Sequence, residues 1–250
     1  MTGEAIKAAA GALAKASRVV AFTGAGVSAE SGIPTFRGAG GLWEGSPVEV
    51  VATPEGFAAD PGKVWRFYEA RRCNVSRRAP NPAHEVLARW HSRFPAYWLA
   101  TQNVDGLHQL AGARYVLELH GSLWRFRCTG CGRRRVDRQV PLPELPPHCG
   151  QCGAMERPDI VWFGEALPGN VLSTAFEAAR QCDVLVAVGT LAVVYPAAGI
   201  IEAAAAHGAT VIEVNPEPSA LAYLAEVVLR GPAGELLPLL DRELDLLREA

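Results

Sequence analysis

Four cysteines form the most specific chemical pattern in the chain. Cys128 and Cys131 make one C-x2-C pair, and Cys149 and Cys152 make a second pair after 17 intervening residues. Thiolates at this spacing are typical of a closed, four-coordinate zinc site that stabilises a fold and leaves no position open for catalysis. We therefore predict one structural zinc ion. Unpaired thiols also indicate a reducing compartment, so we predict a cytoplasmic protein.

A glycine-rich loop follows the first apolar run of the sequence. Gly24, Gly26 and Ala29 match the pattern G-x-G-x-x-G/A, in which the backbone and the following helix N-terminus approach a pyrophosphate. The pattern alone is weak, because a glycine-rich turn also occurs without a ligand. A dehydrogenase would have an acidic ribose ligand about 20 residues further on, but Glu44 stands there in a Gly/Trp/Pro loop. The loop therefore favours dinucleotide binding over hydride transfer, and residues 31–38 suggest a flap over the nucleotide.

Polar clusters follow two further apolar runs. The run 97–100 leads into Thr-Gln-Asn-Val-Asp-Gly-Leu-His at 101–108, and the run 116–119 leads into His120. Either cluster alone could be an ordinary turn, in which Asn and Asp side chains bond to the backbone. Two such clusters at strand ends, beside a phosphate loop, favour a ligand site instead, because ligands of open α/β sheets bind at the carboxyl ends of strands.

The elements that would position these residues are short, nearly continuous apolar runs alternating with helical patterns. Continuous rather than alternating apolar character is typical of parallel strands that are covered on both faces. Helical patterns at 83–94, 171–181 and 197–207 lie between such runs. We predict an α/β fold with a Rossmann-like, doubly wound parallel sheet. Its six strands are expected at 19–22, 97–100, 116–119, 184–188, 211–214 and 227–229.

Two segments lack this alternation. Residues 38–79 are rich in Gly, Pro and aromatics and become helical near 62–72, and residues 125–157 hold the four cysteines. We interpret both as excursions that form a smaller module. The prediction is one domain, 1–250, with a Rossmann-like core from about 1–40, 81–122 and 157–250 and a small module from 41–80 plus the zinc-binding segment 123–156.

Composition excludes several classes of protein. The 250 residues are 49% hydrophobic and 20% charged, with a net charge of −2, which indicates a globular domain without a broad basic footprint. We predict no stable nucleic-acid binding, although arginines cluster near the cysteines. The uncharged stretch 184–201 reaches the lower limit for a membrane span. Its Gly189-Thr190 and Pro196 favour strand, loop and helix, so we predict no membrane association.

Taken in order, these motifs resemble the sirtuins, a family of NAD-dependent protein-lysine deacylases. The resemblance is carried by GAGVSAESGIPTFR at 24–37, TQNVDGLH at 101–108, His120-Gly121, the paired C-x2-C and VWFGE at 161–165, and it covers roughly 19–237. It implies that NAD is consumed as a co-substrate and that nicotinamide and 2′-O-acyl-ADP-ribose are released. It also implies that acylated-lysine proteins bind as peptides and that the zinc is structural.

The resemblance further implies roles for individual residues. His120 matches the general base, and Asn103 and Asp105 match its catalytic neighbours. The family usually has serine where Leu191 stands, which would weaken NAD affinity modestly. A peptide would be clamped by β-augmentation along the strand at 161–165, with Val161, Trp162, Phe163 and Gly164 as contacts. The residues implied in NAD binding are Gly24, Ala25, Gly26, Ser28, Ile33, Phe36, Arg37, Trp43, Gln102, Asn103, Val104, Asp105, Gly189, Thr190, Leu191, Asn215, Pro216, Glu217 and Ala233.

A pair of residues indicates the acyl group. Tyr68 and Arg71 are at i and i+3, on one face of the predicted helix, and resemble the Tyr-x-x-Arg pair of the sirtuin class that removes succinyl and malonyl groups. A guanidinium binds a carboxylate in a bidentate manner, and a phenol adds a third donor. The alternative is a surface helix in which Arg71 pairs with Glu69 or Glu55.

The leading hypothesis is therefore an NAD-dependent protein-lysine deacylase that removes succinyl, malonyl and also acetyl groups. A second hypothesis is ADP-ribosyl transfer to protein from the same NAD site. A third is a non-catalytic NAD-binding or zinc-ribbon protein. The presence of His120 together with Asn103 and Asp105 argues against the third.

Overall fold

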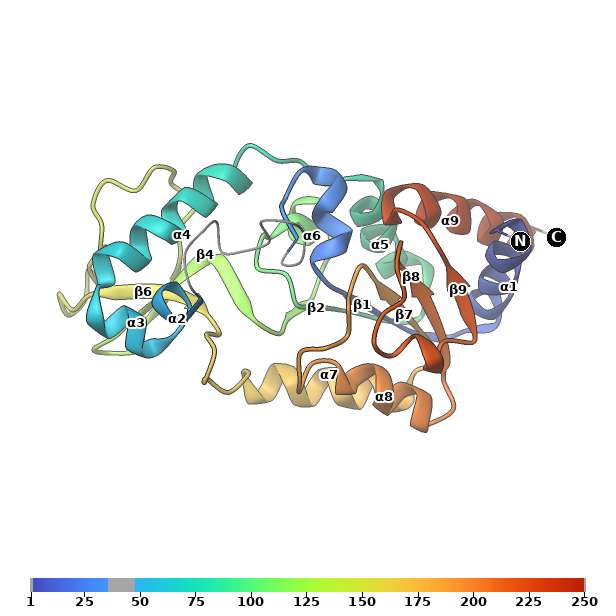
Figure 1. The fold of residues 1–250 in the computed structure, drawn as a ribbon. Coiled ribbons are helices and arrows are strands. Elements are labelled where there is room, and N and C mark those ends of the chain that lie inside the picture. The colour runs from blue at the N-terminus through green and yellow to red at the C-terminus, as the bar shows by residue number, and fades with distance from the viewer. Residues whose placement is uncertain (1, 36–47, 250) are drawn as a thin grey trace.

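A six-stranded parallel sheet forms the centre of the larger part of the molecule (Figure 1). The structure is a computed structural model that describes residues 2–35 and 48–249. The strand order is β3-β2-β1-β7-β8-β9, and each strand overlaps one of the six predicted ranges, which confirms the Rossmann-like α/β fold. The strands are β1 (Arg18–Thr23), β2 (Ala96–Thr101), β3 (Val116–Glu118), β7 (Val184–Val188), β8 (Thr210–Val214) and β9 (Val227–Leu229).

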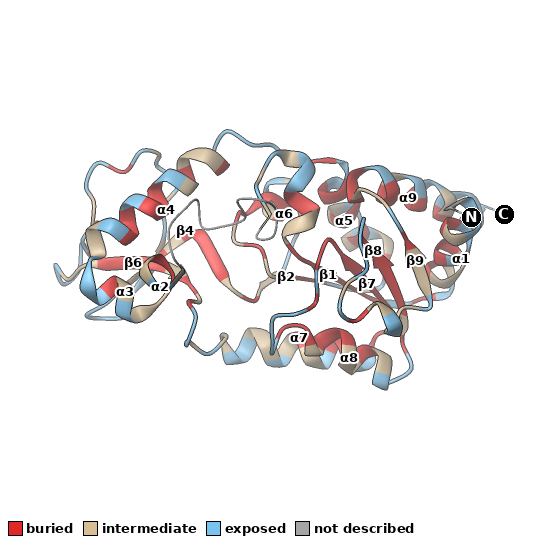
Figure 2. Ribbon diagram, viewed as in Figure 1, coloured by how far each residue is buried: buried red, intermediate tan, exposed pale blue. Residues whose placement is uncertain are grey.

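Helices cover both faces of this sheet, so nearly all residues of the central strands β1 and β7 are buried whichever way they point (Figure 2). Val19 and Ala21 of β1 belong to the core that includes residues of α1, α5 and α9, whereas Val20 and Phe22 belong to the core that includes residues of α7 and α8. This double coverage explains why the strands are continuous apolar runs. The helices are α1 (Thr2–Lys15), α5 (Pro82–Arg93), α7 (Gly169–Gln181), α8 (Gly199–Ala206) and α9 (Ala233–Glu249).

The strand order places a switch in direction next to β1. From β1 the chain first builds outward to β2 and β3, and later returns to add β7, β8 and β9 on the other side. Thr23 is in register with Thr101 of β2 and with Val188 of β7. The loops that begin at Gly24, Gln102 and Gly189 therefore start at one level of the sheet, where doubly wound folds bind their ligands.

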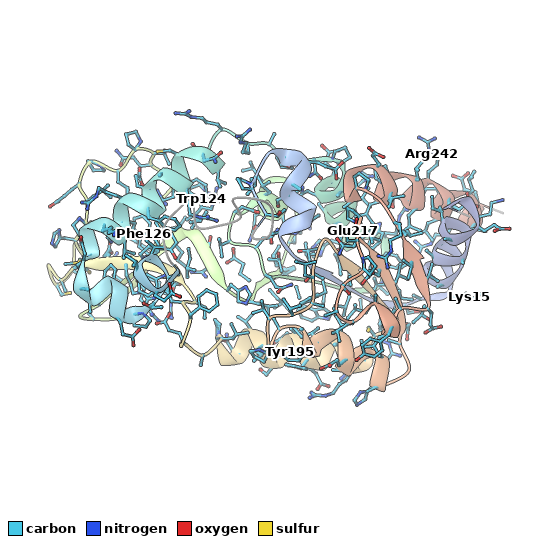
Figure 3. All side chains as sticks on the ribbon, in the orientation of Figure 1. Lys15, Trp124, Phe126, Tyr195, Glu217 and Arg242 are labelled. Atoms are coloured by element: carbon cyan, nitrogen blue, oxygen red, sulfur yellow. The ribbon has the colours of Figure 1, made fainter. Side chains whose placement is uncertain are left out.

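A second, three-stranded antiparallel sheet forms the smaller module beside the main sheet (Figure 1). Its order is β5-β4-β6, with β4 (Gly121–Cys128), β5 (Arg134–Val136) and β6 (Glu156–Ile160). Sequence analysis expected a module here but no strands. In Figure 3, Trp124 and Phe126 lie among the side chains of this module. Three helices complete it: α2 (Val48–Val51), α3 (Pro54–Ala59) and α4 (Pro61–Val75).

Helix α4 is fixed to this sheet by a buried arginine. Arg72 is fully buried, and its guanidinium donates to the carbonyl oxygens of Leu123, Asp137 and Gln139 at 2.8–3.0 Å. It also donates to the Glu69 carboxylate at 3.2 Å, so the buried charge is paired. Removing such a partner leaves a buried charge uncompensated, which is strongly destabilising. The arginine therefore holds the orientation of the helix that carries Tyr68 and Arg71.

The uncharged stretch 184–201 forms β7, a loop and the start of α8, as predicted. Among the described helices, none combines the length and the apolarity needed to span a bilayer. The remaining short elements are the 3-10 helices η1 (Ala25–Ser31) and η2 (Ala222–Leu224) and the one-turn helix α6 (Leu107–Leu110).

Candidate active site

A cavity of about 910 Å³ is lined by residues of both the main sheet and the small module. Its walls come from the loops after β1, β2, β7 and β8, from α4, and from the segment after β6. In Figure 3, Glu217 lies on the main-sheet side and Trp124 on the side of the small module. The predicted site residues that line it are Gly24, Ala25, Gly26, Tyr68, Arg71, Gln102, Asn103, Val104, His120, Val161, Trp162, Phe163, Gly164, Gly189, Thr190, Leu191, Asn215, Pro216, Glu217 and Ala233.

Three described residues of the predicted NAD site, Ile33, Ser28 and Asp105, are not among the residues that line the cavity. Phe36, Arg37 and Trp43 lie outside the described residues. Ile33 is partly buried against the core of the small module, and its N–H donates to the carbonyl oxygen of Ser28 at 3.3 Å. Ser28 and Asp105 are buried and bonded to each other by side chains. They are therefore positioned to support residues of the cavity wall.

The glycine loop packs directly on the loop after β7. The N–H of Gly26 donates to the carbonyl oxygen of Gly189 at 2.8 Å, and a Cβ on Gly26 would lie 2.7 Å from the Gly189 Cα. Gly189 itself has a φ of +60°, so neither position accepts a side chain without displacement. The helix predicted after the loop is the tighter 3-10 helix η1 rather than an α-helix. The close approach of two backbones forms the floor that a dinucleotide requires.

A chain of buried hydrogen bonds, which runs through His84 and Ser28, holds the side chains of Asn103 and Asp105 in place. His84 accepts the backbone N–H of Asn81 at Nδ1, 3.3 Å away, so Nε2 carries the proton and faces the Ser28 hydroxyl at 3.3 Å. Ser28 donates to Asp105 at 2.8 Å and accepts from the Asn103 amide at 3.2 Å. Burial lowers the pKa of His84 to about 4 and raises the pKa of Asp105. Sequence analysis missed His84, which has no local motif that distinguishes it.

His120 presents a free basic nitrogen to the cavity. Its Nδ1 lies 3.0 Å from the carbonyl oxygen of Gln102. Because a carbonyl can only accept, Nδ1 carries the proton and the lone pair is on Nε2. Burial lowers the pKa of His120, and the hydrogen bond to Gln102 opposes this only in part. The imidazole is therefore neutral near pH 7, as a general base must be.

Hydrogen bonds connect the loops after β7 and β8, where the sirtuin resemblance places the adenosine half of NAD. The Thr190 hydroxyl accepts from the Gln102 amide at 2.9 Å, and the Asn215 amide donates to the Thr190 carbonyl oxygen at 3.1 Å. The Leu191 carbonyl oxygen accepts the Ala220 N–H at 3.0 Å, so this residue contributes its backbone to the loop. Backbone floor, amide donors and a large cavity together fit a dinucleotide.

A further link joins η1 to the start of α9. The Glu30 carboxylate accepts the Gly234 N–H at 2.7 Å, directly beside the cavity residue Ala233. A Cβ on Gly234 would lie 2.8 Å from that carboxylate. An acidic group at a helix N-terminus is favourable, so the contact holds two cavity walls together. Sequence analysis quoted Glu30 in a motif but assigned it no role.

The far end of the cavity is formed by α4 and apolar neighbours. Tyr68 is 1% exposed, and its oxygen accepts the indole N–H of Trp162 at 2.8 Å. Burial raises the pKa of Tyr68, which keeps the phenol protonated, and the nearby Arg71 charge partly opposes this rise. The surface helix of the alternative is wrong, because α4 buries Trp65, Tyr68 and Arg72. Glu69, one of the two carboxylates considered for Arg71, is bonded to Arg72. Sequence analysis missed Ala52, which also lines the cavity.

The segment 161–165 continues from β6 without strand geometry, which corrects the prediction of a strand there. β6 ends at Ile160. The N–H of Val161 donates to the carbonyl oxygen of His120 at 3.0 Å, and the N–H of Phe163 donates to that of Ala52 at 2.9 Å. The first bond extends the β4–β6 pairing by one residue, and the second joins the segment to the residue that follows α2.

The four cysteines converge in the small module. Their sulfur atoms all lie within 4.8 Å of one another, with Cys128 and Cys152 at 3.4 Å and Cys131 and Cys149 at 3.8 Å. Tetrahedral zinc with bonds of about 2.3 Å places its sulfurs about 3.8 Å apart. Backbone N–H groups donate to the Cys128 sulfur and lower the pKa of this thiol to about 6. The cluster therefore fits a closed structural zinc site, as predicted.

Fold and cavity together define a dinucleotide-binding α/β protein with a zinc module. The model of the Sir2 family matches residues 24–196. The NAD-dependent protein deacylase 2 of Pyrobaculum aerophilum is 51% identical over 231 residues, 92% of this chain and 92% of its own. The structure of a Sir2 homologue in complex with NAD matches with a TM-score of 0.90 and 42% sequence identity, and the match covers 99% of this chain and 95% of that chain. The structure of a mutant Sir2 homologue in complex with ADP-ribose matches with a TM-score of 0.93 and 42% identity, and this match covers 100% of this chain and 98% of that chain. The chain belongs to the Sir2 family, which confirms the sirtuin resemblance.

Proposed function

We propose that this Sir2 family enzyme, an NAD-dependent protein deacylase, prefers lysines that carry an acidic acyl group, succinyl or malonyl, and also removes acetyl. The observation that supports the preference is the presence of Tyr68 and Arg71 at the same end of the cavity. Their neighbours include the apolar residues Ala52, Val104 and Ile160. A carboxylate placed there would exchange water for a guanidinium and a phenol donor, which are strong partners for an anion.

The same proposal assigns roles along the rest of the cavity. NAD, as the consumed co-substrate, supplies a ribose carbon that accepts the acyl oxygen when nicotinamide leaves. One water then opens the amide, which frees the lysine amine and leaves the acyl group on the ribose as 2′-O-acyl-ADP-ribose. Gln102 and Asn103, which line the cavity, contact the nicotinamide ribose. Asp105 supports Asn103 through Ser28, whose hydroxyl donates to Asp105 and accepts from the Asn103 amide. His120 takes a proton from a ribose hydroxyl at Nε2. The zinc holds the small module in shape and takes no part in the reaction.

The proposed substrates are acylated segments of proteins, bound along residues 161–164. The structure of one Sir2 homologue contains a myristoylated histone peptide, at TM-score 0.80 and 36% identity to this chain, and another contains a deacetylated p53 peptide, at 0.86 and 29%. The absence of a nucleic-acid partner and a cytoplasmic location stay predictions from the sequence. Relatives named as deacylases favour deacylation over ADP-ribosyl transfer. Mass spectrometry of the treated peptide separates the two, as loss of an acyl group or gain of ADP-ribose.

The decisive experiment compares desuccinylation with deacetylation in one assay with NAD. Charge-assisted hydrogen bonds are worth about 1.5–3 kcal/mol, so Arg71→Met should lower kcat/KM for a succinyl-lysine peptide about 10- to 150-fold relative to an acetyl-lysine peptide. Tyr68→Phe should lower the ratio less, because one neutral donor is lost. Arg66→Met is the matched control, since it removes an exposed arginine from the same helix. A ratio that Arg71→Met leaves unchanged would refute the acidic preference.

A further inference from the structure

The phenol of Tyr68 is held by one specific partner, the indole of Trp162. Trp162 is 2% exposed, and its Nε1–H lies 2.8 Å from the Tyr68 oxygen. An indole nitrogen can only donate, so the phenol oxygen is the acceptor in this bond. The hydroxyl proton of Tyr68 must then point away from the indole. Both side chains line the cavity, so the proton is available to a ligand there.

Trp162 is itself fixed on two sides by an ion pair. The guanidinium carbon of Arg157 lies 3.4 Å from the centre of the indole ring. Arg157 donates to both carboxylate oxygens of Glu165, at 2.7 and 2.8 Å, and Glu165 accepts the backbone N–H of Trp162 at 2.9 Å. A bidentate pair of this kind fixes geometry as well as charge. The indole therefore has little freedom to turn away from Tyr68.

Arg157 and Arg71 differ in whether they line the cavity. The charge of Arg157 is balanced by Glu165, and its side chain is 9% exposed. Arg71 instead lines the cavity on α4, three residues from Tyr68. A cation stacked on an indole also withdraws electron density and makes its N–H a better donor. Arg157 acts on the phenol through Trp162, while Arg71 faces the ligand space.

We propose that Trp162 is a specificity-determining residue: its indole N–H commits the Tyr68 hydroxyl to donate to the distal carboxylate of an acidic acyl group. The inference rests on the proposed function and adds a role for the side chain of a residue so far assigned to peptide binding. Without an acceptor at that position, the buried phenol proton stays unpaired. A site built in this way discriminates against ligands that lack the acceptor, acetyl among them.

The test is Trp162→Phe, which keeps an aromatic ring and the backbone but removes the donor. The desuccinylation to deacetylation ratio of kcat/KM should fall about 3- to 10-fold, as for the loss of one neutral hydrogen bond, with a rise in KM for the succinyl peptide. In a Tyr68→Phe background the same substitution should cause no further fall, because the two residues act as one unit. Trp162→Leu, which also lacks a donor, is the second variant if Trp162→Phe fails to fold, and the same fall is expected.

The matched control is Trp65→Phe. Trp65 is a fully buried tryptophan of the same module, and its Nε1–H donates to the carbonyl oxygen of Glu156 at 2.7 Å. This control loses an equivalent bond, so it should lower the melting temperature without changing the ratio. An unchanged ratio in the Trp162 variants, with a fall in Arg71→Met, would overturn this inference alone. An equal fall with and without the Tyr68 hydroxyl would also overturn it, because Trp162 would then act only by filling space. An unchanged ratio in Arg71→Met would instead refute the proposed function.

Discussion

Gly26→Ala tests whether the contact between the glycine loop and Gly189 forms the NAD site. The new Cβ would lie 2.7 Å from the Gly189 Cα and 2.8 Å from its carbonyl oxygen. Ordinary contacts begin near 3.4 Å, so one of the two backbones must move by about 0.7 Å. Neither can yield by rotating a side chain, because both contacts involve main-chain atoms.

The expected loss of stability follows from the free-energy cost of overpacking. Forcing a methyl group into a packed site costs about 1–3 kcal/mol, which in a chain of this size lowers the melting temperature by about 3–10 °C. The displacement also moves two loops that line the cavity. Losing one charge-assisted hydrogen bond to a phosphate would raise the Kd for NAD by at least about 10-fold.

Isothermal titration with NAD and thermal unfolding measure the two effects separately. Gly11→Ala is the matched control, because a Cβ on this residue of α1 meets nothing within 4 Å. It should leave the Kd unchanged and stabilise the helix by up to about 1 kcal/mol. If Gly26→Ala bound NAD with the parent Kd, the glycine loop would not be the dinucleotide floor.

Two further predictions concern the metal and the base. Metal analysis of the purified protein should give about one zinc per chain. Removing the zinc with a chelator should lower the melting temperature and abolish deacylation, because the four thiolates and the metal together hold the small module. Full activity without zinc would contradict this. His120→Ala should abolish acyl removal while NAD binding stays measurable. Since burial lowers the pKa of His120, the neutral base persists to lower pH. The acid limb of kcat/KM for the parent enzyme should then lie below about pH 6.5, and an acid limb above pH 7 would count against the assignment.

The main sheet could be predicted from the sequence because its strands are buried on both faces. Runs such as 184–188 are then continuously apolar, which is a strong local signal. The small sheet gave no such signal. β5 is three residues long with two arginines, and β6 carries Pro158 and, in the described part of the chain, is an edge strand beside β4. These strands exist because tertiary packing around Trp65 and Phe126 overrides weak local preference.

The residues of the candidate site also include some that could be predicted from the sequence and some that could not. The glycine loop and the polar clusters could be predicted, because a backbone that approaches a ligand closely needs glycine, and catalytic side chains follow strand ends. Ala52 and His84 could not, because a single alanine or histidine forms no pattern. The structure brings Ala52 to the cavity through the carbonyl bond to Phe163, and His84 to Asp105 through Ser28. Such positions depend on packing between segments that are distant in the sequence.

The two ends of the cavity therefore differ in what determines them. At the proposed NAD end, backbone atoms of the glycine loop and of the loop after β7 are in direct contact, so we expect substitutions there to change NAD binding and stability together. At the acyl end, side chains from α4 and from the segment after β6 meet, and the partners Tyr68 and Trp162 are 94 residues apart. Substitutions at the acyl end can change the preferred acyl group while the NAD floor stays intact. The proposed function therefore assigns the acyl preference to the small module and the reaction with NAD to the main sheet.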